Sequence, residues 1–330
     1  MRVTNSMLTR HFLRNLDNNL KQLDHIQMQM ATGRKFFRPS DDPVGSARSL
    51  QIRRSIARIE QYQRNAQDAN AWLRETETVL MQVKDIIQNA SELTIQGANG
   101  ALSDNDRKAV AVAIRGLQEQ LVLAGNSSFA GRYIFGGSNT QTPPFSVENG
   151  VLYYNGRELN TVDTAVLEEL DALSKERVIY DLGAGLQQDA DTGVTKGINV
   201  AFPGSNLMGY GQDPDGLPNS LYSILEDIAV IYETSNDASD QIQPYIGKLQ
   251  EKLEGVLTQL TDIGERTKFL DFMEGRLEDA YLNYVTRQSE IEDVDQARAI
   301  IDFSMKEAVY RSALAIGARI IQPTLVDFLR

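Results

Sequence analysis

The sequence of 330 residues contains no cysteine, and aromatic residues make up only 7% of it. Without cysteine the chain can form no disulfide bond, thiolate metal site or cysteine nucleophile. No stretch approaches the roughly 18 consecutive apolar residues of a membrane-spanning helix, so we expect no membrane insertion. The first residues also lack the apolar segment of a cleavable secretory signal. With few aromatic side chains, the core must rely on leucine, isoleucine, valine and alanine.

Histidine is almost as scarce, because only His11 and His25 are present. Both lie in one expected helix, in which a separation of fourteen residues spans about 21 Å. They are therefore too far apart to bind one metal ion or to form a catalytic pair. No motif elsewhere supplies an activated nucleophile or a nucleotide-binding loop. We predict a protein that is not an enzyme and has no catalytic, metal-binding or cofactor-binding residue.

Positive charge is concentrated near the N-terminus although the whole chain carries a net charge of −12. Residues 1–70 hold 12 lysines and arginines against 6 acidic residues, whereas residues 141–240 hold 4 against 17. A basic arm of this kind can bind nucleic acid or a membrane surface. Here the arginines alternate with leucines at helical spacing, without the aromatic residues that stack on bases. We therefore favour solvated or intersubunit helix faces and expect no nucleic acid.

Proline is absent from residues 44–142 and from residues 245–322. Both stretches can hold long helices, because proline inside a helix costs about 3 kcal/mol. Residues 143–218 hold five of the nine prolines and are rich in glycine. This distribution predicts a mainly α protein with an inserted β-rich domain and long antiparallel helices. We expect terminal helices at 1–40 and 286–330, a helical rod at 41–140 and 221–285, and an inserted outer domain at 141–220.

A leucine stripe marks the first expected helix, with steps of 3, 4, 3 and 7 residues. Its members are Leu13, Leu16, Leu20, Leu23 and Met30. The spacing is typical of a coiled coil, and the helix is expected to end at Gly33. Ser40, Asp41 or Asp42 can then cap the next helix, and Pro43 suits its first turn. That helix is expected to continue to about residue 96.

Short-range signals define the elements that follow. Ser103, with Asp106 three residues later, predicts the start of a third helix that folds back and reaches about residue 124. Asn149-Gly150 and Asn155-Gly156 stand among β-branched and aromatic residues, which predicts hairpin turns. Residues 178–180 and 198–202 are further strand candidates. Helix is expected to resume near residue 221.

The C-terminal segment repeats small and apolar residues at helical spacing. They are Val294, Ala297, Ile301, Met305, Ala308, Ser312 and Ala315. This narrow seam suits close helix–helix contact, and alone it would bury little, so we expect it to be poorly ordered without a partner helix. We predict that the leucine stripe packs against Val294, Ile301, Met305 and Ala308, and that neighbouring subunits bury what remains exposed.

Several motifs occur in the order found in bacterial flagellins and their relatives. Residues 29–35 read Gln-Met-Ala-Thr-Gly-Arg-Lys, residues 39–47 read Pro-Ser-Asp-Asp-Pro-Val-Gly-Ser-Ala, and residues 289–295 read Ser-Glu-Ile-Glu-Asp-Val-Asp. Together they resemble the two terminal signatures of the flagellin family, with Gly33, Asp41, Asp42 and Pro43 in the first. The chain length and one further stretch resemble the family members that join the hook to the filament. That stretch includes Gly131, Tyr133, Phe135, Gly136 and Gly137.

The resemblance implies a fold, a location and partners. It implies that the terminal helices line the inner tube of an assembly, that the rod forms the next layer, and that the β-rich domain projects outward. It implies an extracellular position in the flagellum, reached through the flagellar type III export channel without cleavage. The implied partners are the first hook-associated protein, flagellin, further copies of the chain in a ring, and an export chaperone on the C-terminal region.

Three alternatives stay open from the sequence. A short flagellin would form the filament itself. A coiled-coil protein could use its basic N-terminal region to bind nucleic acid or a membrane. An enzyme could reside in residues 141–240, although that region lacks both histidine and cysteine.

Overall fold

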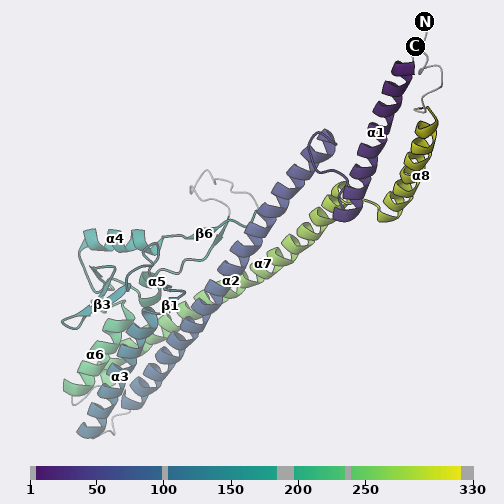
Figure 1. Cartoon of the computed structure of the whole chain (residues 1–330). Coiled ribbons are helices and arrows are strands. Elements are labelled where there is room, and N and C mark those ends of the chain that lie inside the picture. The colour runs from purple at the N-terminus through teal and green to yellow at the C-terminus, as the bar shows by residue number, and fades with distance from the viewer. Residues whose placement is uncertain (1–4, 99–102, 184–196, 235–238, 321–330) are drawn as a thin grey trace. The chain divides into compact units, whose positions relative to one another are not determined.

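The computed structural model describes residues 5–98, 103–183, 197–234 and 239–320. Long helices dominate it, as Figure 1 shows. They are α1 (Asn5–Thr32), α2 (Pro43–Ala98), α3 (Asp104–Gly125), α6 (Leu221–Thr234), α7 (Ser239–Glu292) and α8 (Gln296–Ile320). The prediction of a mainly α fold with a smaller strand-rich region is confirmed.

Local capping explains where the long helices begin. The Asp42 carboxylate accepts hydrogen bonds from the amides of Val44 (3.1 Å) and Gly45 (2.9 Å), so it caps α2. Ser103 and Asp106 form the predicted capping box at the start of α3. Both predicted helix starts are confirmed. They were predictable from the sequence because each cap depends on side chains only a few residues away.

Between α3 and α6, the described residues form seven short strands, of which the last five lie in the predicted insert. They are β1 (Ser128–Phe129), β2 (Arg132–Tyr133), β3 (Phe145–Glu148), β4 (Val151–Tyr154), β5 (Arg157–Glu158), β6 (Ile179–Tyr180) and β7 (Ile198–Asn199). The antiparallel sheet has the order β3-β4-β5, while β1-β2 and β6-β7 form separate pairs. Asn149 and Asn155 adopt φ angles of 52° and 48°, which confirms the two predicted Asn-Gly turns.

Two details of the insert differ from the sequence prediction. Residues 198–202 were expected to form a strand, but only Ile198 and Asn199 pair before Pro203 ends the extended segment. The insert also holds helices α4 (Thr164–Ser174) and α5 (Gly204–Met208), which the strand-rich interpretation missed. Asp163 caps α4 by accepting from the amide of Ala165 at 3.0 Å.

Contacts divide the chain into two compact units. Unit 1 comprises residues 1–60 and 279–330, and unit 2 comprises residues 61–278. Nearly all buried apolar side chains belong to unit 2, where α2, α3, α6, α7 and the insert share one core. Leu80 and Tyr154 are among its fully buried members. The division into three domains stays a prediction.

No helix within the described ranges has the length and apolar character needed to cross a membrane.

Candidate assembly surface

Helices α1 and α8 lie side by side within unit 1 (Figure 1). Along both helices, buried or partly buried positions recur at steps of three and four residues, as in a coiled coil. On α1 they include Phe12, Leu16, Asn19, Leu23, Ile26 and Met30. On α8 they include Ala299, Phe303, Lys306, Tyr310, Ala313 and Gly317. We call these two rows the inner seam.

Two direct contacts fix the inner seam. A Cβ atom on Gly317 would come within 2.4 Å of the Phe12 ring, so only glycine allows the helices to approach this closely there. Farther along the pair, the Lys306 ammonium donates to the Gln22 side-chain oxygen at 2.7 Å. The seam is therefore specific at these two places, although it buries few large side chains.

Outside the inner seam, α1 and α8 carry large apolar residues that are exposed in the single chain. On α8 they are Ile300, Ile301, Met305, Val309, Leu314 and Ile316, and on α1 they are Met7, Leu8, Leu13, Leu20 and Met28. Ile301 is 60% exposed and Met305 is 58% exposed. We call this set the outer face. So many exposed large apolar side chains on one helix pair are typical of an interaction site, because their exposure to water costs free energy.

The predicted pairing of the terminal helices is therefore only partly correct within the chain. Leu16, Leu23 and Met30 lie in the inner seam, whereas Leu13 and Leu20 are 50% and 46% exposed. Of the predicted partners of the leucine stripe, Ile301, Met305 and Ala308 are exposed in the single chain, whereas Val294 is partly buried. Helix α8 is apolar on more than one side, so spacing alone could not select the row that contacts α1. The role of these residues in assembly stays a prediction.

The two terminal signatures meet where α1 ends and α7 ends. Gly33 adopts a φ angle of +74°, which stops α1 in the left-handed conformation that glycine accepts. Its carbonyl oxygen then accepts from the amide of Val294 at 2.8 Å, and the Lys35 amide donates to the Glu292 carbonyl oxygen at 2.7 Å. Arg34 and Asp293 form an isolated antiparallel bridge between these bonds. A short backbone clasp thus joins the N-terminal and C-terminal signatures.

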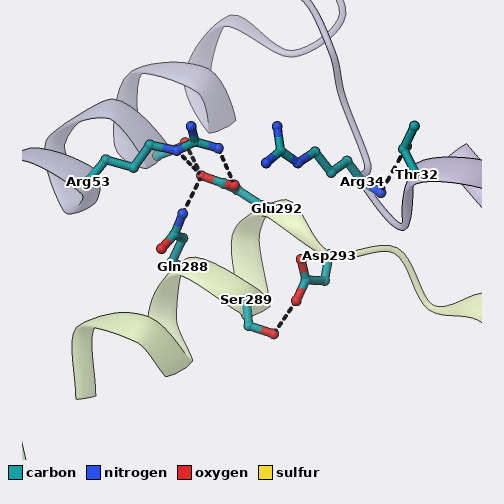
Figure 2. Close-up of polar contacts among 8 residues, drawn as sticks. Thr32, Arg34, Arg53, Gln288, Ser289, Glu292 and Asp293 are labelled. Atoms are coloured by element: carbon teal, nitrogen blue, oxygen red, sulfur yellow. Dashed lines mark hydrogen bonds and ion pairs between the residues drawn. The ribbon is translucent and has the colours of Figure 1, made fainter. Parts of the chain in front are cut away.

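A buried carboxylate reinforces the clasp, as Figure 2 shows. The Arg53 guanidinium donates to both oxygens of Glu292, at 2.7 and 2.5 Å. Ser49 and Gln288 also donate to the Glu292 carboxylate, the latter at 3.2 Å. The Glu292 side chain is only 6% exposed, while that of Arg53 is 45% exposed. We call these four residues the Glu292 clasp; sequence reasoning missed it because Ser49 and Glu292 lie 243 positions apart.

The electrostatics of the clasp follow from this geometry. The Arg53 hydrogen bonds, with those of Ser49 and Gln288, lower the pKa of Glu292 from its ordinary 4.5 to about 2. Burial acts in the opposite direction, but it is outweighed. The same bonds raise the pKa of Arg53. The pair therefore stays charged throughout the physiological pH range and joins α2 to the end of α7.

The remaining signature residues also have structural roles. Asp41 accepts from the amides of Phe37 (3.1 Å) and Arg38 (3.0 Å), which shapes the turn before α2 and lowers the pKa of Asp41. Pro43 is the first residue of α2, where its missing N–H is harmless. Tyr133 lies in the short strand β2, next to the turn at Gly131, whose φ angle is +77°.

The glycine pair in the further stretch admits close neighbours. A Cβ atom on Gly136 would meet the Asn139 carbonyl oxygen at 2.1 Å, and one on Gly137 would meet the Glu176 carboxylate at 2.2 Å. Glu176 in turn accepts from the Ser138 amide at 2.7 Å. The buried Phe135 carbonyl oxygen accepts from the Tyr154 hydroxyl at 3.0 Å, and burial raises the pKa of Tyr154 to about 12.

Within the described ranges, no group of three or more histidine, cysteine, aspartate or glutamate side chains is placed to hold a metal ion. The feature suited to protein–protein contact is the outer face, whereas the Glu292 clasp is a contact within the chain.

Comparison with known proteins agrees with this geometry. Residues 3–140 match the bacterial flagellin N-terminal helical region. The chain is 28% identical to flagellar hook-associated protein 3 of Escherichia coli over 95% of both lengths, and 26% identical to flagellin FlaB2 of Treponema pallidum over 93% and 91%. A putative flagellar hook-associated protein of Vibrio parahaemolyticus shares the fold, with a TM-score of 0.61 and 20% identity over 77% of this chain and all of that one. These matches confirm the resemblance to flagellins and their hook-associated relatives.

Proposed function

We propose that this chain, which carries the flagellin N-terminal helical region, is a structural subunit of the bacterial flagellum at the junction between hook and filament. The observation that carries the proposal is the similarity to a hook-associated protein over 95% of both chains. A structural role fits the outer face, since a helix pair with exposed apolar rows is suited to join copies of itself.

The outer face supplies the mechanism of assembly. Neighbouring subunits bury Ile301, Met305 and Leu13, which one subunit leaves in water. Contacts between different faces of successive copies generate a ring when the rotation closes and a helical tube when it does not. The subunit thereby meets the first hook-associated protein on one side and flagellin on the other, with copies of itself in a ring.

The proposal also covers how the chain is exported and what binds it before export. The chain leaves the cell through the flagellar export channel without cleavage and functions outside the cell. Before export, a chaperone covers the C-terminal region, whose exposed apolar residues on α8 would otherwise associate prematurely.

The test replaces two outer-face residues with aspartate, as the double variant Ile301→Asp/Met305→Asp. Both side chains are more than half exposed, so the free chain should fold. The expected result is loss of filaments and motility in cells that lack the unmodified chain, with an unchanged circular dichroism spectrum of the monomer. Leu123→Asp/Val162→Asp is the matched control, because these unit 2 residues are 72% and 73% exposed. Normal filaments in the outer-face variant would sink the proposal.

A second candidate is a short flagellin, since a flagellin of Treponema pallidum is also similar over most of the chain. Polymerisation of the purified chain distinguishes the two functions. A junction subunit alone should not form long filaments, whereas a flagellin should elongate from added filament seeds.

A further inference from the structure

Two Asn-Gly pairs occupy the two turns of the three-stranded sheet. Asn149-Gly150 links β3 to β4, and Asn155-Gly156 links β4 to β5. The backbones are closely matched, with φ angles of 52° and 81° in the first pair and 48° and 78° in the second. The three-stranded sheet therefore contains the same dipeptide twice in nearly the same conformation.

The surroundings of the two asparagines differ. Asn149 is exposed, and its carboxamide makes no hydrogen bond to any described residue. A Cβ atom built on Gly150 or on Gly156 would meet nothing within 4 Å, so the two turns are equally open at the glycine and differ at the asparagine. Asn155 is partly buried, its side-chain nitrogen donates to the Gly136 carbonyl oxygen at 3.4 Å, and its side-chain oxygen is shielded from solvent.

We propose that Asn149 is a site of spontaneous deamidation. The Gly150 backbone nitrogen attacks the side-chain carbonyl carbon of Asn149, a C–N bond forms, and the carboxamide nitrogen leaves as ammonia with the proton from the glycine nitrogen. In this step the bond between the side-chain carbonyl carbon and the carboxamide nitrogen breaks, so only that nitrogen leaves as ammonia, while the carbon and its oxygen stay in the succinimide ring. Water then opens the succinimide at either of its carbonyl carbons, which gives aspartate or isoaspartate. The following glycine favours this reaction because it has no Cβ to shield its nitrogen. At Asn155 the same reaction first requires local opening.

The product changes the tip of the hairpin. A neutral amide becomes a carboxylate beside Glu148, which places two negative charges side by side. Isoaspartate also adds a methylene to the backbone between Glu148 and Val151, which are paired across the hairpin. The other end, where buried Phe145 pairs with buried Tyr154, holds the sheet in place. Deamidation therefore alters the exposed tip and leaves the core unchanged.

The test follows both sites in one sample. The purified full chain is aged at body temperature in mildly alkaline buffer, and peptide mapping with mass spectrometry measures deamidation at Asn149 and Asn155. Electron-transfer fragmentation identifies the isoaspartate. We expect Asn149 to react at least about tenfold faster than Asn155, since the latter must open first. In concentrated urea the chain is unfolded, so the two deamidation rates should converge. Each rate then depends only on the Asn-Gly dipeptide and no longer on the fold.

Three outcomes would overturn the proposal. The first is equal rates at the two sites in the folded chain. The second is an Asn149 that stays intact while the unfolded chain reacts, which would mean that the turn geometry protects it. The third is a rate ratio that persists in urea, which would assign the difference to neighbouring residues in the sequence. Asn149→Gln serves as the control variant, since its longer side chain forms the ring far more slowly while remaining exposed.

Discussion

The two compact units bury their apolar residues to very different extents. In unit 2, α2, α3, α6, α7 and the insert share a core that includes Leu80, Ile114 and Tyr154, each with no exposed surface. In unit 1, the buried apolar side chains among the described residues are Ile59 and Ala299. Both units contain long helices, so helix content does not explain the difference.

The difference indicates where each unit obtains its stability. Unit 2 is stabilised by its own core, as expected for a domain that folds alone. Helices in water gain most of their stability from packing an apolar side, so the α1–α8 pair is marginal in the single chain. The apolar residues that would stabilise unit 1 further are those of the outer face, which are available to other subunits.

The largest expected effect comes from a matched pair of leucine substitutions. Leu80→Ala removes a fully buried side chain and should lower the free energy of unfolding of unit 2 by about 2–5 kcal/mol. Leu20→Ala removes a side chain that is 46% exposed, and should change the stability of the free chain by less than about 1 kcal/mol. Urea denaturation monitored by circular dichroism measures both. Equal losses would contradict the comparison.

Acid should affect unit 1 through the Glu292 clasp. The folded pKa of Glu292 is about 2, below its ordinary 4.5, so its contribution is complete above about pH 4.5. That contribution should fall as the pH drops from 4.5 towards 2, by up to about 3 kcal/mol in total. Amide hydrogen exchange at the end of α7, followed against pH, measures it. Glu292→Gln should flatten this dependence, and an unchanged slope would show that other groups cause it.

Removal of the cation tests the same clasp at neutral pH. Arg53→Ala leaves the buried Glu292 carboxylate without its main donor, which should destabilise unit 1 by about 1–3 kcal/mol. The matched control is Arg54→Ala, because Arg54 is exposed and makes no ion pair with the described residues. Hydrogen exchange of α1 and α8 should increase in the first variant alone. Similar exchange in both variants would mean that solvent screening at the half-exposed Arg53 leaves its ion pair with Glu292 little effect on the stability of unit 1.

The smallest expected effects compare one helix cap in each unit. Asp42→Ala removes the cap of α2 in unit 1, and Ser103→Ala removes the cap of α3 in unit 2. Each should cost about 1 kcal/mol. In the marginal unit 1 this loss should accelerate exchange over the whole α1–α8 pair, whereas in unit 2 it should remain within the first turn of α3. If faster exchange stayed within the first helical turn in both variants, the result would argue against the marginal stability of unit 1.

The sequence predicted the features that depend on nearby residues. The caps at Asp42 and Ser103 and the turns at Asn149 and Asn155 were found because each is determined within a few positions. Helix α4 was missed because glycine, proline and strand signals dominate the region around it. Its apolar residues recur at helical spacing, so a shorter window could have found it.

The candidate site was predictable only in outline. Exposed apolar rows on the terminal helices were visible as spacing, yet α8 offers two such rows, and Ala299 to Gly317 proved to be the one that contacts α1. The Glu292 clasp gave no local signal, because its partners on α2 lie more than two hundred residues away.

The clasp also constrains the order in which the chain can fold. Unit 2 is one continuous stretch, so it can form before either end is available. Unit 1 requires loop closure between residues 243 positions apart at the clasp and 284 positions apart at Gln22 and Lys306. Such closures carry a large entropic penalty, which falls sharply once the folded unit 2 has shortened the effective loop. The terminal pair should therefore be the last part of the molecule to form and the first to open.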